Sequence, residues 1–157
     1  LRNIFLAEAP RAIEYLDRNS HVHLTPLEFY PDYYPDEPGA TLGDIGHAIQ
    51  SYAEAERCSV VRDFCGHGLG RVFHDAPNVL HYGAAGKGME LREGMFFTIE
   101  PMINLGTWEV KMMNDGWTAV TRDKSLSAQF EHSLGVTADG VQIFTTSPMG
   151  LHKPPYD

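Results

Sequence analysis

The sequence has few cysteines, no excess of basic residues and no long hydrophobic run. Two cysteines are too few for a disulfide scaffold, and the N-terminus lacks the basic start and apolar core of a signal peptide, so we expect a reducing, cytoplasmic location. The 12 Lys and Arg residues against 21 Asp and Glu give a formal net charge of -9, which argues against nucleic-acid binding. No apolar run approaches the roughly 20 residues that span a bilayer, so no membrane partner is expected.

The chain is long enough for one domain with a hydrophobic core, since 43% of its 157 residues are hydrophobic. Residues 1–38 predict a short strand and a helix, followed by an irregular segment rich in Pro and Tyr. Residues 39–148 predict an α+β domain, and residues 149–157 predict a tail. The first residue is Leu1 rather than Met, which we interpret as the mark of a fragment.

Within residues 39–148, one helix is followed by strands. Thr41 is a typical N-cap residue, and Asp44 stands where an acid complements the helix dipole. Apolar residues at helical spacing follow at Leu42, Ile45, Ile49, Tyr52 and Ala53. Strands are predicted at residues 59–64, 95–104, 108–113, 117–122, 126–137 and 141–145, with Asp-Gly turns at 114–116 and 138–140. This order indicates an antiparallel meander.

Three polar residues stand in contexts that argue for a special role. His67 lies between two glycines, which indicates a tight turn or the close approach of a bound group. Glu100 and Glu131 lie in apolar strands, where a carboxylate is costly unless it is paired, binds a metal or faces water. One imidazole and two carboxylates suit Zn, Mn, Fe or Co better than Mg.

Other polar residues have simpler interpretations. His21 and His23 have the spacing of strand ligands but no third ligand nearby, so we interpret them as solvated loop residues. Cys65 and His67 could form a thiol–imidazole pair, but a partly buried thiol is the favoured interpretation. His81 is interpreted as lying on a face of its element or satisfying a backbone group.

Four motifs closely resemble the type I methionine aminopeptidases, in the same order and at similar separations. They are Cys65-Gly-His-Gly-Leu-Gly-Arg-Val-Phe-His74, Gly94-Met-Phe-Phe-Thr-Ile-Glu-Pro-Met102, Asp115-Gly-Trp-Thr118 and Ser127-Ala-Gln-Phe-Glu-His132. The resemblance runs from Pro38 to about Pro148 and implies half of a pita-bread fold, with helices packed on a curved antiparallel sheet. It implies removal of the N-terminal methionine from newly made polypeptides by metal-dependent hydrolysis.

The resemblance also implies roles for particular residues. His67, Glu100 and Glu131 match ligands of two divalent ions, with Glu131 touching both, and Thr98 and Gln129 would hold the ligands from behind.

On the substrate side, His74 matches the catalytic histidine that contacts the scissile amide. Phe73 and Trp117 match walls of the pocket for the methionine side chain. The expected partner is a peptide or nascent-chain N-terminus.

The family pattern is also incomplete in this chain. Two aspartate ligands and a further histidine, which the family supplies from an upstream hairpin ending in His-Gly-Asp, do not occur here, and residues 19–37 lack the family's long helix. Two alternatives therefore stay open. The chain is a catalytically inactive binding module of the same fold, or a half-domain that buries its sheet edge by forming a homodimer.

Overall fold

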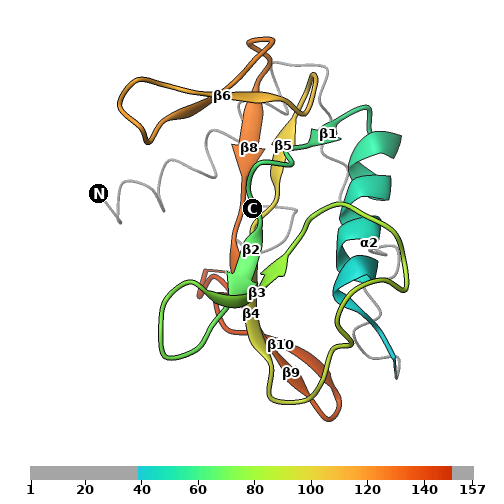
Figure 1. The fold of residues 1–157 in the computed structure, drawn as a ribbon. Coiled ribbons are helices and arrows are strands. Elements are labelled where there is room, and N and C mark those ends of the chain that lie inside the picture. Colours follow the sequence, from blue (N-terminus) through green and yellow to red (C-terminus); the bar gives the residue numbers. More distant parts are fainter. Residues whose placement is uncertain (1–38, 150–157) are drawn as a thin grey trace. The chain divides into compact units, whose positions relative to one another are not determined.

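The computed structural model describes residues 39–149 (Figure 1). The expected strand, helix and irregular segment of residues 1–38, the histidines at 21 and 23, and the tail beyond Met149 lie outside the described residues. Among the described helices, none has the length and apolarity that crossing a membrane requires.

The predicted helix is α2, Leu42–Ala55. It begins after Thr41, whose backbone N–H and side-chain hydroxyl both donate to the Asp44 carboxylate at 2.7 Å. These bonds lower the pKa of Asp44, with the Thr41 hydroxyl as the largest cause. The sequence prediction of this helix and of its first residues is confirmed.

The largest sheet has five antiparallel strands in the order β10-β9-β4-β2-β3. Their bounds are Gly66–Gly68 for β2, Asp75–Val79 for β3, Phe96–Ile99 for β4, His132–Thr137 for β9 and Gly140–Ile143 for β10. Because β4 pairs with β2 on one side and β9 on the other, the expected meander is wrong: neighbouring strands are often far apart in the sequence.

A second sheet has three antiparallel strands in the order β1-β5-β8, with bounds Ser59–Val60, Met102–Asn104 and Ser127–Gln129. A two-stranded hairpin joins β6, Val110–Met112, to β7, Ala119–Thr121. Both Asp-Gly turns lie where predicted, between β6 and β7 and between β9 and β10.

Several predicted strands are shorter than expected. The segment 95–104 breaks into β4 and β5 at Glu100 and Pro101, where proline has no N–H for a strand ladder. The segment 126–137 also breaks, into β8 and β9, at Phe130 and Glu131, where no proline is present. Each break ends the pairing in one sheet and starts it in the other, so both glutamates stand at sheet junctions.

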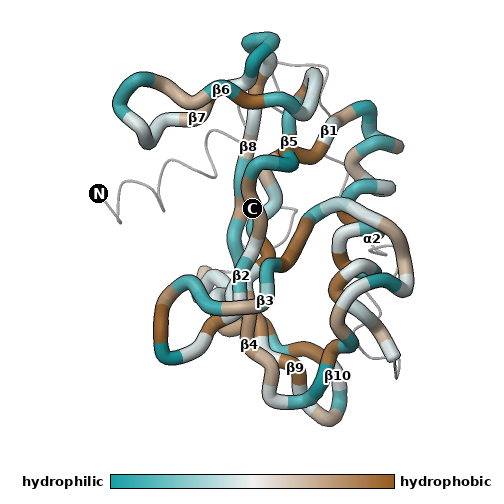
Figure 2. The backbone as a smooth tube through the Cα atoms, viewed as in Figure 1, coloured by the Kyte–Doolittle hydropathy of each residue, from teal (hydrophilic) through white to brown (hydrophobic). Residues whose placement is uncertain are grey.

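The hydrophobic core joins α2 to the five-stranded sheet, and α2 lies beside β1 and β3 in Figure 1. Its buried members are Ile45, Val79, Phe97, Leu134 and Val136. Figure 2 shows hydrophobic stretches at β9 and β10 and at intervals along α2. Burial of these side chains stabilises the sheet by roughly 1.5–3 kcal/mol each. The core therefore fixes the positions of the strands next to His67, Glu100 and Glu131.

Candidate metal centre

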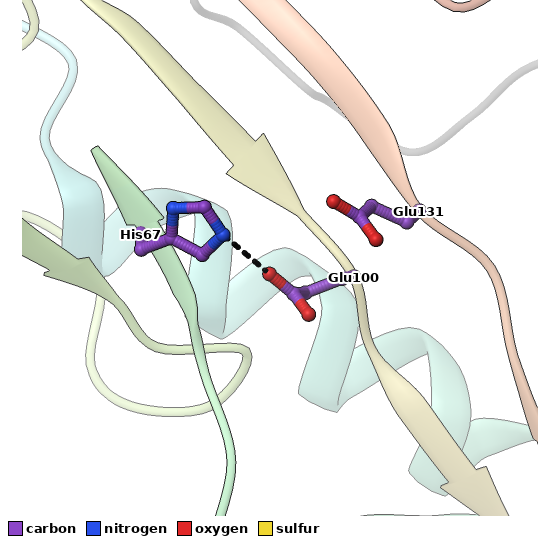
Figure 3. A group of neighbouring side chains, drawn as sticks. All are labelled: His67, Glu100 and Glu131. Atoms are coloured by element: carbon purple, nitrogen blue, oxygen red, sulfur yellow. Dashed lines mark ion pairs between the residues drawn. The ribbon is translucent and has the colours of Figure 1, made fainter. Parts of the chain in front are cut away.

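The structure brings the three predicted metal ligands together. His67 lies on β2, Glu100 follows β4, and Glu131 lies between β8 and β9. One ligand atom from each falls within 4.8 Å of the others, and His67 Nε2 lies 3.5 Å from Glu100 Oε1. Figure 3 shows the three side chains converging from β2, from the segment that follows β4 and from the segment between β8 and β9.

The three ligands differ in burial. The His67 side chain is 9% exposed and that of Glu100 is 17% exposed, whereas Glu131 is exposed. The cost of burying a carboxylate therefore falls mainly on Glu100, and the simple interpretation that a glutamate faces water holds for Glu131.

The glycines beside His67 are required by close packing between strands. A Cβ added to Gly66 would overlap the carbonyl oxygen of Thr98, and one added to Gly68 would overlap the carbonyl oxygen of Ala76. Both glycines lie in β2 and not in a turn, so the tight-turn interpretation is wrong. At these two positions the close approach is to the chain's own neighbouring carbonyls.

Hydrogen bonds orient the His67 ring. Its Nδ1 lies 3.0 Å from the carbonyl oxygen of Gly68, which can only accept, so a hydrogen bond at this contact requires the proton on Nδ1; in the neutral ring, Nε2 is then the nitrogen with a lone pair. Nε2 faces Glu100 Oε1 at 3.5 Å, so an imidazole nitrogen and a carboxylate oxygen, two atoms that can bind a metal ion, lie side by side. Together with Glu131, this donor set fits a divalent ion that accepts nitrogen and oxygen ligands.

Thr98 links two of the ligands from inside the sheet. It is 1% exposed, and its hydroxyl oxygen accepts the His67 backbone N–H at 3.0 Å. The same hydroxyl donates to Glu100 Oε1 at 2.8 Å. Gln129 approaches the other side, where its amide nitrogen lies 3.3 Å from the Glu100 carbonyl oxygen and 3.5 Å from Oε2. Both residues therefore contact Glu100, as a supporting role requires.

The sequence did not single out His81 as part of this site, yet the His81 ring contacts the backbone of Glu100. It is 1% exposed, and its Nε2 accepts the backbone N–H of Glu100 at 3.1 Å. Burial lowers the pKa of His81 to about 4, so the ring is neutral near neutral pH. The interpretation that His81 satisfies a backbone group is confirmed.

Of the residues predicted to contact the substrate, two lie beside His67 and the third lies in a separate hairpin. Phe73 and His74 lie in the loop between β2 and β3, with ring centroids 5.5 and 4.4 Å from that of His67. Trp117 lies in the β6–β7 hairpin and is 88% exposed. No ring contact between Trp117 and Phe73 is found within residues 39–149, and their role as two walls of one pocket stays a prediction.

Cys65 does not act as an activated thiol in this arrangement. It is half-buried, and burial followed by the charge of Glu100 raises its pKa above the ordinary value. A raised pKa lowers the thiolate fraction, which is the reactive form. The interpretation of Cys65 as a partly buried thiol is confirmed.

Comparison with known proteins shows which protein family the chain matches. Residues 37–138 match the family model described as metallopeptidase family M24. A methionine aminopeptidase of Rickettsia prowazekii is 65% identical over 120 residues, which are 76% of this chain and 46% of that protein. A methionine aminopeptidase of Escherichia coli K12 is 54% identical over 109 residues, 69% of this chain and 41% of that protein.

Solved structures of methionine aminopeptidases also match this chain. The crystal structure of the Rickettsia prowazekii enzyme matches with a TM-score of 0.68, over 69% of this chain and 44% of that one. A methionine aminopeptidase from Thermotoga maritima, 46% identical, also matches with a TM-score of 0.68, over 71% of this chain and 45% of that one. The chain thus spans less than half the length of these relatives.

Proposed function

The chain belongs to metallopeptidase family M24, and on this premise we propose that it serves the removal of N-terminal methionine from polypeptides by metal-dependent hydrolysis. The expected α+β architecture, part of the pita-bread fold of the similar methionine aminopeptidases, is confirmed. The observation that carries the proposal is the convergence of His67, Glu100 and Glu131 within 4.8 Å, in a chain that is 65% identical over 120 residues to a methionine aminopeptidase.

In the proposed site, three residues would hold divalent ions. His67 would offer Nε2, Glu100 its partly buried carboxylate and Glu131 its exposed carboxylate, the last to both ions. Thr98 and Gln129 keep Glu100 in place through their hydrogen bonds. When bound, Co, Mn, Fe or Zn ions supply Lewis-acid chemistry, which activates water for attack and stabilises developing negative charge.

The substrate is proposed to enter beside the β2–β3 loop. His74 is exposed and lies next to the ligand His67, so its ring can donate a hydrogen bond to the carbonyl oxygen of the scissile amide. Phe73, 71% exposed, offers apolar surface for a methionine side chain, and Trp117 is proposed as a further wall. The partner is then a nascent-chain N-terminus, and the proposed location is the cytoplasm.

A binding assay and a peptide assay test this function. The full 157-residue chain is titrated with Co²⁺ by calorimetry and incubated with the peptide Met-Ala-Ser in excess Co²⁺ or Mn²⁺. We expect binding and release of methionine, and a loss of affinity of at least ~10-fold in Glu100→Gln, because one charged ligand is removed. Glu93→Gln, at an exposed position outside the ligand group, is the matched control and should bind as the original chain does. Absence of both binding and turnover in a folded chain contradicts the proposal.

A second candidate is a catalytically inactive binding module. Within residues 39–149 the candidate metal group has three members, fewer than the five ligands that the family resemblance implies. This candidate is favoured if the chain binds Met-Ala-Ser, with a loss of affinity in Phe73→Ala, but releases no methionine.

A further inference from the structure

Glu100 occupies a backbone position that no strand supports. The β4–β9 ladder ends at Ile99, and β5 begins at Met102, so the peptide groups of Glu100 fall in the break between two sheets. Pro101 follows and has no N–H of its own. A carboxylate at such a junction has a fixed direction only if other groups hold its backbone.

Side chains from two distant elements hold that backbone. The N–H of Glu100 donates to Nε2 of His81, which lies just after β3, at 3.1 Å. The carbonyl oxygen of Glu100 accepts from Gln129 of β8 at 3.3 Å. Both ends of the residue are therefore fixed, and the Thr98 hydroxyl then holds the carboxylate toward His67.

His81 is suited to this task and to no other in the site. Because Nε2 accepts a backbone N–H, that atom cannot bind a metal at the same time. The ring is 1% exposed, so it is closed to substrate as well. A buried imidazole is costly to desolvate, and its bond to Glu100 offsets part of that cost.

We propose that His81 is a positioning residue for the metal centre. By accepting the N–H of Glu100, it fixes the direction of the Glu100 carboxylate toward the proposed metal position beside His67. The inference rests on the proposed metal-binding function. It predicts that the acceptor atom of His81, and not merely the volume of its ring, sets the affinity for divalent ions.

Two substitutions in the full chain separate acceptor from volume. His81→Leu removes the acceptor at similar size, whereas His81→Gln places an amide oxygen near the position of Nε2. Calorimetric titration with Co²⁺ should show affinity reduced ~10-fold or more in His81→Leu and largely restored in His81→Gln. The visible absorption spectrum of bound Co²⁺ should change in the first variant and return toward the original in the second. His47→Leu, an exposed histidine on α2, is the matched control.

A second measurement needs no metal. In ¹⁵N-labelled protein, a scalar coupling across the N–H···N hydrogen bond should join the Glu100 amide nitrogen to Nε2 of His81. The Glu100 amide should exchange with solvent faster in His81→Leu and at close to the original rate in His81→Gln.

The outcomes keep the two proposals apart. If the original chain binds no Co²⁺, the proposed function fails, while the coupling and the amide exchange still decide whether His81 holds Glu100. The positioning role is overturned if the coupling is absent, or if a folded His81→Leu binds Co²⁺ as tightly as the original chain. It is also overturned if His81→Gln is folded and as weak as His81→Leu.

Discussion

The candidate metal centre and the β6–β7 hairpin both depend on polar side chains that hold backbone N–H groups, but over very different distances along the chain. In the metal centre, Thr98 and His67 are 31 positions apart, and His81 and Glu100 are 19 apart. In the hairpin, the Asp115 carboxylate accepts from the N–H groups of residues two and three positions ahead. One region is assembled by the fold, and the other by its own turn.

Burial follows the same division. Thr98 and His81 are each 1% exposed, so a polar atom that loses its partner there has no water to replace it. Asp115 and Trp117 in the hairpin are exposed, and water can take over any bond that is lost. The same kind of substitution should therefore have a larger effect in the metal centre.

The largest difference is expected for glycine substitution. Gly66→Ala places a methyl group against the Thr98 carbonyl oxygen, a backbone atom that cannot move without shifting β4, and should lower the free energy of unfolding by about 3 kcal/mol. Gly116→Ala in the hairpin has open space but a φ of +70°, and should cost about 1 kcal/mol. Urea unfolding of both variants measures the difference. Equal losses would contradict the close strand packing around His67.

A smaller difference is expected for threonine. Thr98→Val keeps the shape but leaves the buried N–H of His67 without its acceptor, which should cost about 2 kcal/mol. Co²⁺ affinity should fall too, because Glu100 loses its donor. Thr118→Val removes the exposed hydroxyl that donates to Asp115 at 2.6 Å, and its effect on unfolding should be much smaller. Thr98→Ser should recover most of both losses, and a Thr98→Ser variant as weak as Thr98→Val would contradict the role given to the hydroxyl.

The smallest effect is expected from acid on the hairpin. Bonds from the Thr118 hydroxyl and then from the Trp117 N–H lower the pKa of Asp115 to about 2, from an ordinary 3.8. Since the unfolded chain binds the proton more readily, this contribution to stability is complete above pH 3.8 and is lost as the pH falls toward 2. A carbon NMR titration of the Asp115 carboxyl measures the pKa directly. An ordinary pKa, or an unchanged acid response in Asp115→Asn, would show that the turn is not held this way.

The parts that the sequence predicted well are those with local causes. The helix Leu42–Ala55 follows from the Thr41 cap and from apolar residues at helical spacing. The hairpin turn follows from Asp115 and Gly116, whose conformations depend on their neighbours.

The parts that the sequence predicted poorly have distant causes. Strand β2 was not predicted, because Gly66 and Gly68 have low β propensity. These glycines are required by the carbonyl groups that pack closely against them, which the local sequence does not show. The order of the five-stranded sheet and the role of His81 depend on residues far away in the chain, which no local pattern encodes.

By itself, the sequence singled out His67, Glu100 and Glu131 by their unusual contexts, and the resemblance of its motifs implied their role as metal ligands. Only the tertiary structure decided that the three converge, that Glu100 is the partly buried one, and that Thr98 and His81 hold it. The physical reason is that ligand identity resides in single side chains, whereas ligand direction depends on buried hydrogen bonds that form only when distant strands pack together.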